Sequence, residues 1–213
     1  MQLNLGQWVV IIIAAILILG YILGYYYNRQ RAEQIFIWLK QGLSTLGEVS
    51  LGEKLPGMAT GGRLEVNQAA APLKRVEAVY MLAPRENLLF LIFHLLQGRG
   101  DELIVWINYQ SKPEQCVEVA RRGDQQFEKR LKDKEKPALS IVDVNRGLQI
   151  AVEEIPGALQ AGKVQSFLQH YPSTVIRLAL RPEKPNLFLR ANLHHMQRVT
   201  TEELFTALKE LGG

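Results

Sequence analysis

The hydrophobic pattern divides the chain into an apolar N-terminal end and a longer part in which apolar and polar residues alternate. Every residue from Trp8 to Tyr27 is apolar, aromatic or glycine, and no charged side chain precedes Arg29. A helix of that length rises about 30 Å, which is the thickness of the hydrocarbon core of a bilayer. A secretory signal peptide would carry an early basic residue and end in small residues, whereas this run ends in tyrosines. We therefore predict a transmembrane helix over residues 8–27.

The residues that flank the span predict its orientation. No basic side chain precedes it, and three follow it closely: Arg29, Arg31 and Lys40. By the positive-inside rule, the C-terminal side stays in the cytoplasm and the N-terminus lies outside or in a lumen. The span closes with Tyr25, Tyr26 and Tyr27. These side chains suit the inner interface, where an aromatic ring contacts lipid while its hydroxyl stays hydrated.

Two glycines within the span predict a contact with another helix. Gly20 and Gly24 have the small-xxx-small spacing that lets a second helix approach closely in lipid. Glycines also occur in membrane helices without such a partner. Partner-helix packing on this face and an incidental pair of glycines are therefore both open.

The residues after the span predict a second helix and then a linker. Residues 31–46 place apolar side chains at near-helical intervals, namely Ile35, Leu39, Leu43 and Leu46. This amphipathic helix either lies in the headgroup region, with Trp38 and Lys40 as interfacial anchors, or continues the span and docks on the domain. Residues 47–62 are rich in glycine and contain a proline, which predicts a linker or long loop.

From residue 63 onward the pattern is that of an α+β domain. Alternating or β-branched apolar runs predict strands at 64–66, 76–82, 103–107, 117–119, 141–144, 148–152, 174–180 and 187–193. The turn-like residues at 145–147 and 182–185 predict two hairpins. Leu103 to Ile107 is predicted to be buried on both faces. We expect mostly antiparallel strands with packed helices.

Four segments of this part predict helices. They are residues 88–96, 123–136, 164–171 and the C-terminal segment from 200, where Thr200 and Glu203 have capping-box spacing. Gly98 supplies a natural C-terminal stop for the first of them. The run 88–96 is apolar except for His94 and has almost no polar face, so it is either fully buried or meets another apolar surface. The predicted organisation is a span at 8–27, an amphipathic helix and linker at 28–62, a cytoplasmic domain at 63–196 and a C-terminal helix at 197–213.

Motifs of catalysis are missing from the sequence. It contains no phosphate-binding glycine loop followed by lysine, no nucleophile elbow and no HExxH. The single cysteine, Cys116, excludes an internal disulfide framework and any multi-cysteine metal site. The adjacent His194 and His195 would face opposite sides of a strand and so would not chelate one ion together. We predict a protein that is not an enzyme and has no catalytic residue, metal, cofactor or small-molecule substrate, with a hydrolase of dispersed site as the least favoured alternative.

One strongly basic segment predicts either a surface that binds nucleic acid or a helix face that is exposed to solvent. Its positive residues include Arg121, Arg122, Lys129, Arg130 and Lys132, which can contact phosphates of RNA on a ribosome. Acidic residues interrupt the series, beginning with Glu118, Asp124 and Glu128. A solvated helix face with ion pairs between successive turns is therefore the favoured reading, and RNA contact is the alternative.

The order of these elements resembles the calumin family, the coiled-coil-domain membrane proteins of the PAT complex, an intramembrane chaperone of the endoplasmic reticulum. The glycine and aromatic exit from the span is similar, as is a polar start to an apolar helix followed by a strand. The residues that carry the resemblance are 24–28, 84–89, 101–105, 117–120 and 163–171. The similarity covers most of residues 20–195. We expect a short relative of the family, without its signal peptide, acidic lumenal region and C-terminal coiled coil.

The resemblance implies a role in the insertion of multipass membrane proteins. Family members are scaffolds beside the translocon that hold a small partner membrane protein and contact the ribosome. The expected partners are therefore membrane lipid, a small membrane protein, a translocon or insertase channel, and the ribosome. The expected location is the plasma membrane in a prokaryote and the endoplasmic reticulum in a eukaryote. A membrane-tethered module that binds lipid or regulatory proteins is the alternative.

Overall fold

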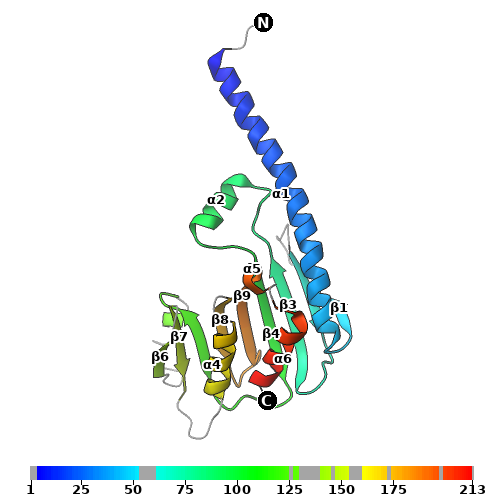
Figure 1. Ribbon diagram of the computed structural model, residues 1–213, viewed down its shortest axis with the longest axis vertical. Helices are drawn as coiled ribbons and strands as arrows, with labels where there is room; N and C mark the ends of the chain where they lie inside the picture. Colours follow the sequence, from blue (N-terminus) through cyan, green and yellow to red (C-terminus); the bar gives the residue numbers. More distant parts are fainter. Residues whose placement is uncertain are drawn as a thin grey trace.

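The computed structural model describes residues 4–52, 61–124, 127–129, 140–144, 147–153, 160–171, 174–196 and 199–212. Within these residues a long helix, α1 (Leu5–Ser44), is joined to a domain built on a nine-stranded sheet. Figure 1 shows the N-terminal half of α1 projecting from the domain, whereas its C-terminal half lies along the sheet. The predicted α+β class is confirmed, together with one candidate membrane-spanning helix in the described part of the chain.

α1 joins the predicted span and the predicted amphipathic helix in one unbroken element. It begins with a capping box, in which the Asn4 side chain accepts a hydrogen bond from the Gln7 amide at 2.9 Å and the Gln7 side chain accepts one from the Asn4 amide. Near its C-terminal end, Ile35, Leu39 and Leu43 are fully buried against the domain. Of the two readings of residues 31–46, continuation and docking is therefore the one that the structure shows.

The sheet is antiparallel throughout, in the order β1-β2-β3-β4-β9-β8-β5-β7-β6. Its strands are β1 (Val49–Leu51), β2 (Gly61–Val66), β3 (Leu73–Met81), β4 (Glu102–Tyr109), β5 (Val117–Arg121), β6 (Ser140–Val144), β7 (Leu148–Val152), β8 (Val175–Leu180) and β9 (Leu187–Asn192). Both predicted hairpins, β6 with β7 and β8 with β9, are confirmed. The neighbours β3 and β4 are joined by residues 82–101, which leave the end of the sheet to form α2 (Leu88–Leu96).

Helices cover one face of the sheet and enclose the main core. The C-terminal half of α1, α4 (Gln160–His170) and α6 (Thr201–Leu211) pack on this face, as Figure 1 shows, and α5 (Leu193–Met196) follows β9 directly. The predicted capping box at Thr200 begins α6. The buried hydroxyl of Tyr109 on β4 donates a 2.6 Å hydrogen bond to the carbonyl of Leu208, which fixes α6 to the sheet.

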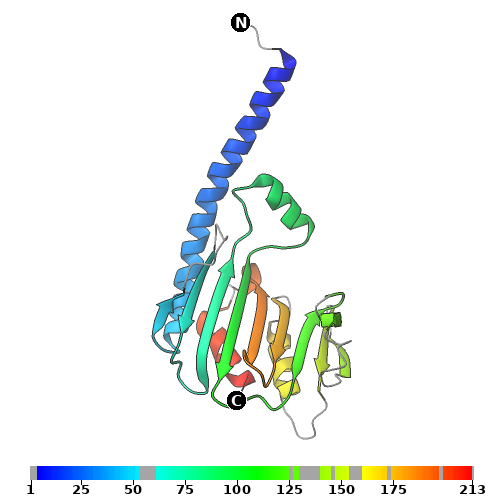
Figure 2. The same ribbon diagram turned by 180° about the vertical axis from the view of Figure 1, so that it is seen from behind.

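The opposite face of the sheet carries polar and aromatic side chains, and none of the described helices covers it in Figure 2. Arg63 pairs with Glu77 at 3.0 Å, and Trp106 packs against Phe188 with ring centroids 6.1 Å apart. From Leu103 to Tyr109 on β4, buried residues alternate with partly exposed ones, and Ile104 and Trp106 are partly exposed on this face. The prediction that Leu103 to Ile107 is buried on both faces was therefore wrong.

Two further predictions meet the structure only in part. The predicted linker 47–62 contains β1 and the first residues of β2, because main-chain pairing along β2 overrides its high glycine content; residues 53–60 lie outside the described part. Of the predicted helix 123–136, residues 127–129 are helical, and 125–126 and 130–136 lie outside the described residues.

Candidate functional site at the junction of α1 and α2

α2 has no buried residue, although it is the most apolar part of the domain sequence. Six large apolar side chains are exposed on it: Leu89, Phe90, Ile92, Phe93, Leu95 and Leu96. Their exposed fractions run from 55% at Ile92 to 82% at Leu96. Of the two readings of this run, burial in the core is excluded. A patch of this kind marks a surface that meets another apolar phase or molecule.

Both ends of α2 are closed by hydrogen bonds. The Asn87 side chain accepts a bond from the Phe90 amide at 3.1 Å, which makes Asn87 the N-cap. Beyond the other end, Gly98 has φ +66° and its amide donates to the carbonyl of Leu95 at 2.9 Å. Because glycine adopts this left-handed conformation without strain, the predicted stop at Gly98 is confirmed.

The two glycines of α1 make close room for the segment that leads into α2. A Cβ atom at Gly20 would overlap the side chain of Leu88, and one at Gly24 would overlap the main chain of Arg85 and Glu86. The face predicted to pack on a partner helix is thus occupied at these two positions by the chain's own residues 85–88. Sequence periodicity alone does not distinguish an internal partner from a separate one.

Polar residues lock this contact in place immediately below the glycines. They form a junction cluster of Asn28, Arg31, Arg85, Glu86 and Asp101. The fully buried Asn28 side chain donates to the carbonyl of Ala83 at 2.9 Å and to the Glu86 carboxylate at 2.7 Å, and it accepts a bond from Arg85 at 3.0 Å. One α1 side chain thereby bonds three groups of residues 83–87, which are called the lead-in to α2.

An ion pair forms the centre of the junction cluster. The Arg85 guanidinium donates to both carboxylate oxygens of Asp101, at 2.7 and 3.1 Å, and Arg31 of α1 lies 3.7 Å from the same carboxylate. Asp101 is 6% exposed and also accepts a bond from the Ala83 amide. On its other side, Arg85 lies 4.9 Å above the ring of Tyr27. Both arginines pair with Asp101, and Glu86 accepts its bond from Asn28, so the cluster ties α1 to the segment before α2 and to the start of β4.

The residues predicted to lie at the membrane interface have different environments in the structure. Tyr25, Tyr26 and Tyr27 are exposed around α1, at the level of the junction cluster. Trp38 does not have the predicted role of interfacial anchor, because its indole donates to the Val199 carbonyl at 3.3 Å and it packs on the domain core. Arg29 and Lys40 are exposed.

The predicted RNA-contacting residues are only partly described. Arg121 and Arg122 are exposed at the end of β5, and Lys129 is exposed on the short helical stretch after it. Arg130 and Lys132 lie outside the described residues. Contact with RNA therefore stays a prediction.

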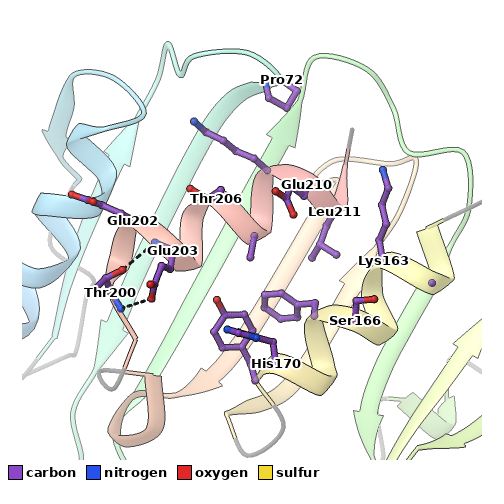
Figure 3. Close-up of a pocket in the computed structure, with 15 residues that line it drawn as sticks. Pro72, Lys163, Ser166, His170, Thr200, Glu202, Glu203, Thr206, Glu210 and Leu211 are labelled. Atoms are coloured by element: carbon purple, nitrogen blue, oxygen red, sulfur yellow. Dashed lines mark hydrogen bonds between the residues drawn. The ribbon is translucent and has the colours of Figure 1, made fainter.

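A groove with a volume of about 1490 Å³ lies between α4 and α6. Figure 3 shows Ser166 and His170 of α4 facing Glu203 and Glu210 of α6 across it. Burial, with smaller contributions from Glu203 and Glu210, raises the pKa of Tyr171 at the groove floor. Among the residues that the structure describes, no three histidine, cysteine or acidic side chains are grouped to hold a metal ion.

Sequence reasoning missed the junction cluster. Arg85 and Asp101 flank the apolar run 88–96 on its two sides, and Asn28 is the first strongly polar residue after the span. Polar residues that bracket an apolar run at both ends, together with one at the end of a span, were the available signal. No protein-family model matches the chain, and no curated protein matches it.

Proposed function

We propose that this protein is a single-pass membrane scaffold that assists the insertion of multipass membrane proteins and is not itself an enzyme. In this proposal α1 spans the bilayer with the N-terminus outside or lumenal, and the domain lies in the cytoplasm. The membrane is the plasma membrane of a prokaryote or the endoplasmic reticulum of a eukaryote. The partners are a small membrane protein and a translocon or insertase channel, with the ribosome as a further partner.

The observation that carries the proposal is the rigid connection between the apolar half of α1 and the domain. α1 runs without a break from its apolar half to Leu39 and Leu43 in the core, and the junction cluster braces it at Asn28. A tether would need only a span and a flexible linker. A continuous, braced helix instead fixes the orientation of the domain to the membrane, as a scaffold between a channel and partner helices requires. The resemblance to the calumin family supports the same role.

The free part of α1 suggests where a partner helix would pack. Leu17 and Ile13 lie on the same side of α1 as Gly20, one and two turns respectively beyond the contact with Leu88, and both are exposed. Ile11 and Ile18 lie on the opposite side and are exposed as well. A scaffold that holds one membrane partner beside α2 should contact it through the first pair and leave the second pair in lipid.

Site-specific photo-crosslinking in living cells tests this proposal. A photoreactive amino acid is placed at Ile13 or Leu17, with Ile11 and Ile18 as matched controls of similar exposure and depth. We expect defined adducts from the first pair, identified by mass spectrometry as a small membrane protein or as insertase or translocon subunits. The proposal is overturned if all four positions give only lipid adducts, and also if gentle solubilisation recovers the protein alone.

A second candidate is a membrane-tethered module that binds lipid or a regulatory protein. The exposed apolar surface of α2 favours it, whereas Trp38, which an interfacial helix would have used, is occupied in the domain. Recovery of a soluble regulatory protein in place of insertion machinery would select this candidate.

A further inference from the structure

α2 stands beside the apolar half of α1, beyond the end of the sheet (Figures 1 and 2). Its first residue, Leu88, packs on Gly20, and Gly20 precedes Tyr27 by seven residues. Seven helical residues rise about 10 Å, and half of a hydrocarbon core is about 15 Å thick. With Tyr25 to Tyr27 at the interface, the start of α2 therefore lies within the hydrocarbon of the leaflet on the domain's side.

The length and composition of α2 suit one leaflet. Its nine residues make a helix about 13 Å long, too short to cross a bilayer. Its partly exposed side, Leu88, Leu91 and His94, follows helical spacing, and the other six side chains are large, apolar and exposed. Polar residues close both ends, with Glu86 and Asn87 before the helix and Gln97 and Arg99 after it. Such an order suits an apolar helix in lipid that is bounded by polar residues.

Main-chain groups at both ends of α2 have partners within the protein, which favours a hydrocarbon environment. In lipid each main-chain donor and acceptor needs a partner within the protein. The Asn87 cap satisfies the Phe90 amide, and the turn at residues 97–99 satisfies the carbonyls of Phe93, His94 and Leu95. The segment before α2 is held at Ala83, whose carbonyl accepts a bond from Asn28 and whose amide donates one to Asp101. The segment can thus enter lipid without leaving these groups unpaired.

From these observations we infer that α2 is a second membrane element, inserted into the leaflet on the domain's side, with its six exposed side chains against lipid acyl chains. The inference rests on α1 spanning a membrane, as the proposed function also does, but it needs no protein partner. Lipid is the occupant because the contact of Leu88 with Gly20 makes the surface of α2 continuous with that of the span. The protein would then meet the bilayer through two elements fixed to each other by the junction cluster.

Depth-dependent fluorescence quenching of the purified full-length protein in phosphatidylcholine vesicles tests the inference. In a Cys116→Ala background, an environment-sensitive probe is attached to Phe93→Cys or Ile92→Cys. Leu17→Cys on the span is the membrane control, and the exposed Lys112→Cys is the aqueous control. We expect blue-shifted emission at both α2 positions and a loss of fluorescence with acyl-chain nitroxide lipids similar to that at Leu17. Lys112 should be insensitive to these lipids.

Two results would overturn the inference. Emission and quenching like those of Lys112 would place α2 in water. Blue-shifted emission without quenching by nitroxide lipids, together with disulfide dimers of the Phe93→Cys variant, would show that a second copy of the chain covers α2. Because the vesicles contain no other protein, failure here leaves the crosslinking test of the scaffold unaffected. Circular dichroism of each labelled variant checks that the fold is retained.

Discussion

At the scale of single residues, Gly24 is the tightest point of the junction between α1 and the lead-in to α2. An added Cβ there would overlap main-chain atoms of Arg85 and Glu86, which cannot move without displacing the junction cluster. At Gly20 the overlap is only with the flexible side chain of Leu88. The two glycines belong to the same small-xxx-small motif, but the structure tolerates an added Cβ atom better at Gly20 than at Gly24.

Substitution of these glycines by alanine should therefore give unequal effects. We expect Gly24→Ala to destabilise the junction by about 1–3 kcal/mol, the usual cost of overpacking, and Gly20→Ala to cost much less. Gly6→Ala is the control, because a Cβ there meets only Asn4 at an ordinary 3.5 Å. Denaturant unfolding in detergent, followed by circular dichroism, measures the difference. Equal stability of the Gly24 and Gly20 variants would contradict the close contact.

Asp101 is the residue on which the charges of the junction cluster depend. Asp101→Asn keeps the size of the side chain but leaves Arg85 and Arg31 without their carboxylate. We expect a loss of about 3 kcal/mol, because removing one partner of a buried ion pair leaves an uncompensated charge. Glu48→Gln, at an exposed position, should change stability by less than about 0.5 kcal/mol. The unfolding assay used for the glycines applies, and an unchanged Asp101→Asn variant would show that the pair contributes nothing.

At the scale of elements, α6 is fixed to the sheet by a hydroxyl that titrates at high pH. Burial raises the pKa of Tyr109 above its ordinary value near 10. The folded protein therefore keeps this proton where the unfolded chain loses it, so the associated stability is present below about pH 10 and declines as the pH rises further. In the same way burial raises the pKa of Tyr171 and Tyr80.

The Tyr109→Phe variant separates the hydrogen bond from the titration. We expect it to be less stable than the wild type by about 1 kcal/mol at pH 7, because the Leu208 carbonyl loses its donor. Above pH 10 its stability should fall less steeply than that of the wild type, with a residual slope from Tyr171 and Tyr80. Urea unfolding at pH 7 to 11 measures both. Parallel pH curves for the two proteins would contradict the assignment to Tyr109.

Local sequence signals predicted where the helices and strands lie, but they did not predict what surrounds each element. The capping box at Thr200, the stop at Gly98 and the pairing of β6 with β7 were predicted from neighbouring residues, and the structure has all three. The exposure of α2 and the covering of Gly20 depend on residues 60 or more positions apart in the chain. Hydrophobic periodicity shows that one side of a helix or strand is apolar, but it does not show which surface packs against that side. The contacts of the candidate site therefore became visible only in the structure.

At the scale of the whole molecule, the two elements with exposed apolar surfaces lie at one end. The apolar half of α1 and all of α2 extend beyond the sheet, whereas the groove between α4 and α6 lies on the helix-covered face (Figures 1 and 3). With α1 and α2 in the bilayer, the sheet stands below the membrane with its polar face and the α4–α6 groove accessible from the aqueous side. Partners in lipid and partners in water would then approach different surfaces.

The orientation of the whole molecule is the last expectation, and it depends on the charges beside the span. Arg29 and Arg31 follow the apolar run and no basic residue precedes it, so the domain should lie in the cytoplasm. In a Cys116→Ala background, an impermeant maleimide added to intact cells of a prokaryotic host should label Leu5→Cys, whereas Lys74→Cys should react only after permeabilisation. The opposite pattern would place the domain outside and remove the channel and ribosome as partners. It would leave the insertion of α2 untouched, because the junction cluster ties α2 to whichever leaflet faces the domain.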